Sequence, residues 1–198
     1  MVTVRSDEER VLSIINFFKD YKFYILSVVL VITISVGGYF FSERVKSNQI
    51  LAAKVLYEDW QVTSVQEDRE ELFQNLTENY SDTGYSHLAL LKRGSDLAKE
   101  NNLVESIDVF YQLKENSDGF FGNSLMNGIA RTNIARISIA LGNFEDALKV
   151  LEKYSNDEDA YTHELKGDAL SGIGNDDLAL QQYQSCLLYT SDAADEFS

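Results

Sequence analysis

One uninterrupted apolar stretch, residues 23–41, constrains this chain more than any other feature. Its nineteen residues include no charged side chain, no proline and no amide side chain. As a helix with about 1.5 Å of rise per residue it would extend roughly 28 Å, close to the hydrocarbon thickness of a bilayer. Such a helix satisfies its own backbone polar groups, so lipid can surround it without loss of hydrogen bonds. The stretch predicts a single transmembrane anchor.

The flanks of this stretch fit a membrane span. Tyr24 and Tyr39 stand near its two ends, where amphipathic rings favour the membrane–water interface. Basic residues bracket the span on both sides: Lys19, Lys22, Arg44 and Lys46. A buried core helix is the weaker alternative, because core helices are seldom apolar on every face for about five turns.

A cleavable signal peptide is a second alternative, since Ser35 and Gly37 are small and suitably spaced for cleavage. The stretch exceeds the usual apolar core of about 7–15 residues, however, and aromatic residues follow it directly. We therefore expect an uncleaved signal anchor preceded by a short cytoplasmic segment, residues 1–22. Basic residues are almost as frequent after the span as before it, so local charge does not decide its orientation.

Charge is divided unevenly along the chain. Residues 1–22 carry equal numbers of basic and acidic side chains, so the formal net charge of −15 lies beyond residue 41. An acidic domain without a basic stripe argues against nucleic acid as a partner. The same excess of carboxylates favours basic or neutral protein partners.

Residues that could carry chemistry are few. Cys186 is the only cysteine, so neither a disulfide framework nor a thiolate metal site is available. His87 and His163 lack metal-ligand spacing, and we expect both to serve packing or to lie on the surface. No phosphate-binding, dinucleotide-binding or nucleophile motif occurs. We expect a protein that is not an enzyme and that has no cofactor, no metal and no small-molecule substrate.

Helical periodicity continues on both sides of the anchor. Ser6 and Glu9 resemble a capping box, and the apolar residues after them predict a short amphipathic helix able to lie at the membrane interface. Beyond the anchor, apolar residues recur every three or four positions, which predicts a stalk helix over residues 42–66. A shorter helix around residues 72–80 follows and ends at a turn over residues 81–84.

Three stretches within residues 67–184 repeat one pattern. Each has a small residue in a first helix, a turn residue seven positions on, a second small residue five later and a bulky apolar residue four later still. The copies are Gly94, Asn101, Ser106 and Phe110; Ala135, Gly142, Ala147 and Leu151; and Gly167, Gly174, Ala179 and Tyr183.

This pattern has a physical reason. Small residues let two antiparallel helices approach closely, and Gly-Asn pairs can end one helix in a left-handed conformation and cap the next with an amide oxygen. Asn102 with Glu105 is expected to provide the cap in the first copy. A period in the low thirties built from helix–turn–helix units indicates tetratricopeptide-like repeats. We thus predict an all-α chain, with a single transmembrane helix followed by a tetratricopeptide-like helical-repeat solenoid.

Two segments depart from the repeat. An insert at residues 116–123 contains Phe120 and Phe121, which we expect to pack beneath the following helix; an exposed contact for a partner or a lipid is the alternative. Residues 185–198 show no helical face that matches the repeat and resemble a translated sequencing adapter joined to a truncated reading frame. We expect a non-native or truncated tail there, the alternative being a genuine tail with a reactive Cys186.

Several short segments carry a family resemblance between about residues 8 and 184. They are Phe17-Phe18 before the span, residues 51–57 of the stalk, residues 85–89, residues 134–136, and residues 165–170 followed by Gly174. With the order of parts, they resemble the YfgM-like family of ancillary subunits of the bacterial SecYEG translocon. The resemblance implies a non-enzymatic inner-membrane protein whose C-terminal domain faces the periplasm. It also implies two partners, the Sec translocon and an anchored periplasmic chaperone.

Two functions follow as hypotheses. The first is a translocon-associated scaffold that links the Sec translocon to periplasmic chaperones by protein–protein contacts. The second is a general tetratricopeptide adaptor of another envelope assembly, or a membrane-anchored adaptor that faces the cytosol. Repeat folds carry no function in themselves, so the partner-binding residues stay open. Arg131 and His163 are expected to be accessible positions on the repeats.

Overall fold

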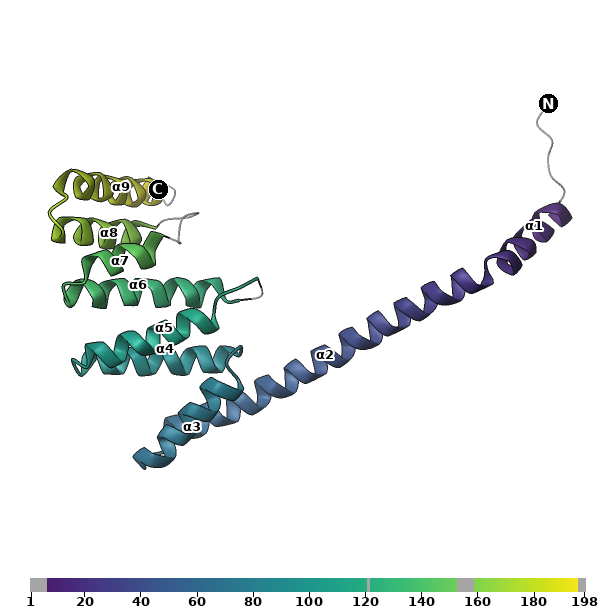
Figure 1. The fold of residues 1–198 in the computed structure, drawn as a ribbon, viewed down its shortest axis with the longest axis horizontal. Coiled ribbons are helices and arrows are strands. Elements are labelled where there is room, and N and C mark those ends of the chain that lie inside the picture. Colours follow the sequence, from purple (N-terminus) through teal and green to yellow (C-terminus); the bar gives the residue numbers. More distant parts are fainter. Residues whose placement is uncertain (1–6, 121, 153–158, 196–198) are drawn as a thin grey trace. The chain divides into compact units, whose positions relative to one another are not determined.

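The computed structural model describes residues 7–120, 122–152 and 159–195, and every regular element in these ranges is an α-helix. The predicted all-α class is therefore confirmed. The chain divides into two units, residues 1–49 and 50–198, which are described separately below. The helices, labelled in Figure 1, are α1 (Asp7–Asp20), α2 (Lys22–Val62), α3 (Gln66–Asn79), α4 (Gly84–Lys99), α5 (Leu103–Asn116), α6 (Ser124–Ala140), α7 (Phe144–Glu152), α8 (Ala160–Gly172) and α9 (Asp176–Asp195).

The first unit contains α1 and the N-terminal part of α2. The apolar stretch, residues 23–41, lies inside α2 and exposes nearly all its side chains, with none buried in its most apolar window. Among the described residues α2 is the one helix long and apolar enough to cross a membrane. The interpretation as a buried core helix is therefore wrong. The proposed cap residue Ser6 lies outside the described residues.

The second unit begins with the C-terminal turns of α2, which pair with α3. Trp60, the only tryptophan, is 2% exposed and stacks at 5.8 Å from the ring of Phe73 on α3. The predicted short helix before residue 80 is α3, and the turn after it ends at Thr83. The hydroxyl of Thr83 accepts a hydrogen bond from the amide of Ser86, which satisfies one of the free amides at the start of α4.

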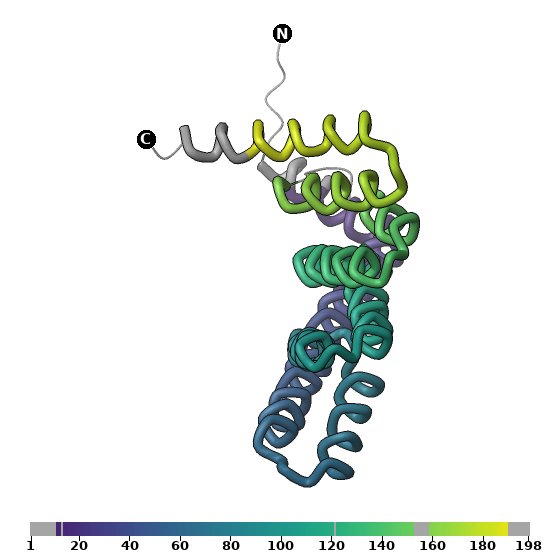
Figure 2. Tube along the Cα trace, turned by 90° about the vertical axis from the view of Figure 1, so that its left-hand side faces the viewer, coloured from purple at the N-terminus to yellow at the C-terminus, as the bar shows by residue number. Residues whose placement is uncertain are grey.

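The remaining helices stack in chain order, as Figures 1 and 2 both show for α4 to α9. Each helix packs on the next, and the first helices of successive pairs also touch, α4 with α6 and α6 with α8. A continuous core of alanine, leucine and isoleucine side chains with Phe110 runs through this stack. Each pair alone leaves an apolar face uncovered, so stacking the pairs is what builds the core.

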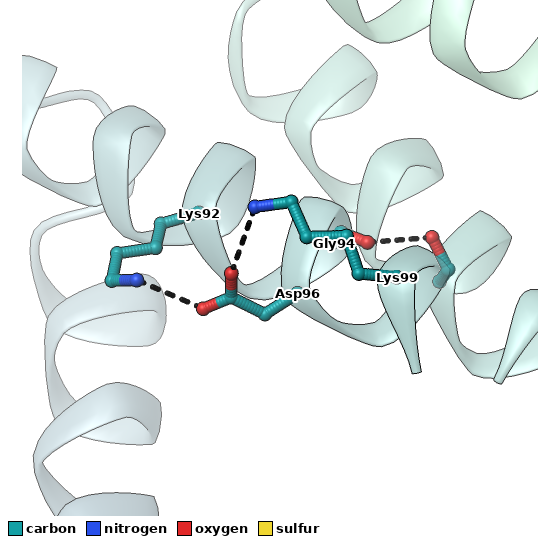
Figure 3. Close-up of polar contacts among 5 residues, drawn as sticks. Lys92, Gly94, Asp96 and Lys99 are labelled. Atoms are coloured by element: carbon teal, nitrogen blue, oxygen red, sulfur yellow. Dashed lines mark hydrogen bonds and ion pairs between the residues drawn. The ribbon is translucent and has the colours of Figure 1, made fainter. Parts of the chain in front are cut away.

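The small residues of the repeat lie where close packing was predicted. Ser106, Ala135 and Ala147 are fully buried. A Cβ atom placed on Gly94 would lie only 2.9 Å from the Phe110 ring, and one on Gly167 would lie within 3 Å of the Tyr183 ring. The hydroxyl of Ser106 donates a hydrogen bond of 2.7 Å to the carbonyl of Gly94, which ties α5 to α4 (Figure 3). Glycine is therefore required where an aromatic ring meets the first helix.

The three turn residues adopt one conformation. Asn101, Gly142 and Gly174 have φ values of 64°, 79° and 80°. The following amides bond back to the carbonyls of Leu97, Ser138 and Leu170 at 2.8–2.9 Å, the Schellman pattern that ends a helix on a left-handed residue. The predicted turn position is thus confirmed in all three copies.

The capping prediction is only partly right. The Asn175 side chain accepts a long hydrogen bond of 3.5 Å from the Leu178 amide. Asn102, in contrast, makes no side-chain cap, because its ψ of 61° departs from the extended conformation in which cap residues usually present their side chain to the next turn. The predicted cap of Asn102 with Glu105 is wrong.

The loop between α5 and α6 and the C-terminal tail are the two segments that depart from the repeat. Phe120 is 95% exposed in the loop between α5 and α6, so it does not pack beneath α6; Phe121 lies outside the described residues. The loop is held tight by Gly122, where a Cβ would clash with the backbone of Ser117 and Asp118. At the other end of the chain α9 continues to Asp195, because residues 185–195 contain neither glycine nor proline to stop it. The helix therefore extends beyond residue 184, and a non-native or truncated origin of the tail stays a prediction.

Candidate partner-binding surface

The first helices of the three pairs, α4, α6 and α8, form a connected layer because α6 contacts both α4 and α8. Exposed side chains on each of these helices recur at helical spacing, so each helix presents one stripe to solvent. The stripes consist of Leu88, Lys92 and Lys99 on α4; Leu125 and Arg136 on α6; and Tyr161, Glu164 and Asp168 on α8. We call these eight residues the first-helix surface.

The α4 stripe carries a small ion-pair network, shown in Figure 3. Asp96 lies between two lysines, with its carboxylate 2.9 Å from Lys92 Nζ and 3.5 Å from Lys99 Nζ. The hydrogen bond from Lys92, with smaller contributions from the charges of both lysines, lowers the pKa of the Asp96 carboxyl below its usual value. Two cations against one carboxylate leave this stripe with a net positive charge, and Lys99 stays largely exposed.

The other two stripes differ in sign. On α6, Arg136 is exposed and donates a hydrogen bond of 2.8 Å to the side chain of Asn133. On α8, Asp168 accepts a hydrogen bond of 2.9 Å from the Tyr183 hydroxyl of α9, and Glu164 is exposed beside it. The first-helix surface therefore changes from basic on α4 and α6 to acidic on α8.

The second helices α5 and α7 carry part of the acidic excess of this unit. Lys149 is the one exposed lysine on α5 and α7, whereas six carboxylates on these helices are exposed. These carboxylates are Glu105, Asp108, Glu115, Glu145, Asp146 and Glu152. The first-helix surface carries both charge signs, and the predicted preference for basic or neutral partners stays a prediction. A partner with both charge signs can be matched there if its acidic part faces α4 and α6.

A buried polar network on α6 supports this layer from beneath. Arg131 is only 7% exposed, and its Nε donates a hydrogen bond of 2.6 Å to the side-chain oxygen of Asn127. Asn127 in turn donates to the carbonyl of Lys114 in the last turn of α5, and Arg131 Nη1 donates to the carbonyl of Val150 in the last turn of α7. One helix thus satisfies the C-terminal carbonyls of two second helices, and the guanidinium charge also complements the dipole of α7.

His87 has a related role on α4. Its ring is 3% exposed, and Nε2 lies 3.2 Å from the carbonyl of Asn116 at the end of α5. Within the described part of the chain no group bonds Nδ1, so the neutral ring donates through Nε2 and leaves Nδ1 unprotonated. Burial lowers the pKa of His87 below 6.5, although the Asn116 carbonyl and the charge of Asp82 oppose this shift. The prediction that His87 serves packing is consistent with this position.

The other residues named from sequence lie apart from one another. His163 is half-buried, with Nδ1 2.8 Å from the side-chain oxygen of Gln182 on α9. Cys186 is a free cysteine, partly buried on α9. Arg131 was expected to be accessible, which is wrong because it lies beneath the first-helix surface. Among the described residues, no three His, Cys, Asp or Glu side chains are grouped so that they could hold a metal ion.

The sequence matches the family described as a tetratricopeptide repeat-like domain over residues 16–196. Because this match covers most of the chain, the protein belongs to that family. A search of curated proteins and a search of solved structures found no significant match. The family and the fold together define a repeat scaffold that works through protein–protein contacts, a class that is typically non-catalytic.

Proposed function

We propose that this protein is a scaffold of the bacterial inner membrane, anchored by residues 23–41, whose repeats face the periplasm and link the Sec translocon to a chaperone. In this proposal residues 1–22 are cytoplasmic, residues 42–66 form a stalk, residues 67–184 bind partners, and residues 185–198 are a non-native or truncated tail. The observation that carries the proposal is the apolar stretch at residues 23–41, whose side chains are almost all exposed, whereas the repeat helices α4 to α8 bury an apolar face in the core.

The anchor is supported by the two ends of the apolar stretch. Tyr24 and Tyr39 are 73% and 66% exposed, and Tyr39 lies 5.9 Å from the ring of Phe40. Rings of this kind favour the membrane–water interface, and the helix between them is long enough to cross the hydrocarbon core. A stretch of nineteen mostly apolar residues, almost all of them exposed, would aggregate in water, so lipid is its natural environment.

The choice of partners rests on the resemblance to ancillary translocon subunits and on the division of labour between the two parts. A span with Ser35, Gly37 and Gly38 lets other membrane helices approach closely, since no atom outside the helix backbone lies near either glycine. Stacked helix pairs instead offer an extended surface for a peptide or a folded domain. The translocon is therefore assigned to the span and the chaperone to the repeats.

Topology is the first test of this proposal. Protease added to spheroplasts should degrade residues 45–184 and spare the N-terminal segment, and intact-mass analysis should find residues 1–41 still attached. Survival of the repeats until the membrane is lysed would instead favour an adaptor that faces the cytosol. Loss of the N-terminal residues from the mature protein would mean that the apolar stretch is a signal sequence.

Partner capture is the second test. Photo-crosslinkers at Ser35 or Gly37 should trap translocon subunits, and crosslinkers at Arg136 or Tyr161 on the first-helix surface should trap a chaperone. Asp108 on α5 is the matched control, since it is also exposed but belongs to a second helix. Removal of residues 1–41 should abolish the first set of crosslinks and leave the second measurable. If the repeats trap only an unrelated envelope complex, the general adaptor replaces this proposal.

A further inference from the structure

The amphipathic helix α1 presents an apolar face that is largely exposed. Its apolar side chains are each 53–58% exposed, namely Val11, Leu12, Ile14, Ile15, Phe17 and Phe18. On a helix of 3.6 residues per turn these six occupy an arc of about 220°, whose centre lies opposite Asn16 and Asp20. A face of this kind normally packs against a core or lies in a membrane interface.

We propose that this face of α1 binds a lipid surface, lying in the plane of the membrane at the end where the apolar span begins. This inference rests on the proposed membrane anchor and adds a second lipid contact to it. The argument for lipid begins with the connection: α1 ends at Asp20, α2 begins at Lys22, and the span begins at Phe23. At no more than about 3.5 Å per residue, Phe18 stays within roughly 18 Å of Phe23, so the C-terminal turn of α1 cannot leave the interfacial zone of an anchored chain.

A group of aromatic rings joins α1 to the start of the span. The rings of Phe17 and Tyr21 are 4.9 Å apart, those of Tyr21 and Tyr24 are 6.4 Å apart, and Phe18 lies 6.0 Å from Phe17. Amphipathic rings at the headgroup level are the usual interfacial anchors of membrane proteins. The group therefore places the C-terminal turn of α1 at the same depth as the end of the span.

The charge of this segment indicates how the lipid is bound. Residues 1–22 carry equal numbers of basic and acidic side chains, unlike the polybasic segments that anionic lipids attract. Apolar burial must then supply the binding free energy, with little help from electrostatics. Attachment of α1 is accordingly expected to be independent of anionic lipid and of salt.

Fluorescence quenching in vesicles tests this inference on the full chain. In a Cys186→Ser background, the variants Ile15→Cys, Phe18→Cys, Asn16→Cys and Val31→Cys are labelled with an environment-sensitive dye and reconstituted in phosphatidylcholine vesicles. Nitroxide lipids then report depth. The labels at positions 15 and 18 should emit at shorter wavelength and be quenched most by shallow nitroxides, several-fold more than the label at position 16. Added anionic lipid or salt should leave this difference unchanged.

The label at Val31 separates failure of this inference from failure of the anchor. Deep quenching at Val31 with an aqueous label at Ile15 overturns the lipid contact of α1 and leaves the anchor intact. Absence of quenching at Val31 by any nitroxide overturns the anchor and the inference with it. A shielded label at Ile15 that no nitroxide lipid quenches means that protein, including a second copy of the chain, covers this face, which also overturns the inference.

Discussion

The helix pairs α4–α5 and α6–α7 meet the same packing requirement with different side chains. In α4–α5 the first helix has Gly94, whose Cα faces the fully buried ring of Phe110. In α6–α7 the equivalent positions are Ala135 and Leu151, both fully buried. The α8–α9 pair repeats the first solution with Gly167 against Tyr183. A larger residue on one helix is matched by a smaller one on the other, so total volume rather than residue identity is what the contact requires.

The two pairs also differ in how the end of the second helix is held. The last turn of α5 receives the neutral ring of His87 and the amide of Asn127, whereas the last turn of α7 receives the guanidinium of Arg131. Arginine keeps its charge at every accessible pH, while histidine titrates near neutrality. The α4–α5 pair is therefore the one whose stability should depend on pH, and the α6–α7 pair is the one stabilised by a buried charge.

The largest expected effect comes from filling the glycine contact of the first pair. Gly94→Leu should lower the free energy of unfolding by about 3 kcal/mol, because the Phe110 ring is fully buried and cannot move aside. Gly167→Leu should cost only about 1 kcal/mol, because Tyr183 is partly exposed and can rotate outward. Leucine offsets part of each cost through its better helix propensity, by less than about 1 kcal/mol. Denaturant unfolding followed by circular dichroism measures both.

The order of these two variants is the informative result. Equal losses would mean that the buried ring of Phe110 is as free to move as that of Tyr183. Unchanged melts in both variants would show that the repeat register is misread and that neither glycine faces a neighbouring helix.

The second effect concerns the buried charge of the other pair. Arg131→Met should lower the free energy of unfolding by about 2 kcal/mol, since it removes two charged hydrogen bonds and leaves the oxygen of Asn127 buried without its donor. Arg136→Met is the matched control on the same helix, where the side chain is exposed and the expected change is within about 0.5 kcal/mol. Similar losses in the two variants would contradict the structural role assigned to Arg131.

Sequence alone predicted the parts of the fold that depend on local chemistry. Small residues at fixed spacing and turn residues such as Gly142 determine close approach and chain reversal over a few positions, so their pattern is visible without coordinates. The network of Arg131 and Asn127 was missed because its acceptors lie on two other helices. A signal was nevertheless present, since these two polar residues stand four apart on a helix face that also carries the apolar Ala130 and Ile134.

Phe120 and the net charge show two further limits of prediction from sequence. Phe120 was expected to pack because apolar residues follow it on α6, but the glycines around it determine a tight loop that points its ring outward. A net charge of −15 does not show which helices carry it, so the preference for basic or neutral partners stays a prediction. Composition therefore bounds the partners of this domain only loosely, and the stripes on α4, α6 and α8 are the better guide.

Two substitutions give the α4–α5 pair the side-chain combination of the α6–α7 pair. Gly94→Ala alone and Phe110→Leu alone should each destabilise the protein by about 1 kcal/mol, the first by overpacking and the second by leaving a cavity. The double variant reproduces the Ala–Leu combination of α6–α7 and should lose less than the sum of the two, with a coupling of about 1 kcal/mol. Ala169→Gly with Phe110→Leu is the control, because Ala169 is buried on α8, which does not contact α5 in the described part of the chain. If the losses in free energy of unfolding of the two single variants simply add in the double variant, the sizes of the side chains at positions 94 and 110 do not compensate for each other.

The smallest expected effect is the pH dependence of the first pair. The folded protein holds His87 neutral, with its pKa below the ordinary value of 6.5, so the unfolded chain binds a proton there more readily than the folded one. The stabilisation is complete above about pH 6.5 and is lost as the pH falls through that value toward the lowered pKa. Denaturant unfolding at about pH 7.5 and about pH 5.5 should therefore show that His87 contributes more to the free energy of unfolding at the higher pH.

Substitution isolates this contribution from the titration of the many carboxylates, whose protonation relieves charge repulsion and acts in the opposite direction. His87→Gln removes the only buried imidazole, and its stability should fall less between the two pH values than that of the wild-type chain. If His87→Gln and wild type respond to pH in parallel, the protonated ring of His87 is accommodated at the end of α5 and the contrast between the two pairs does not extend to titration.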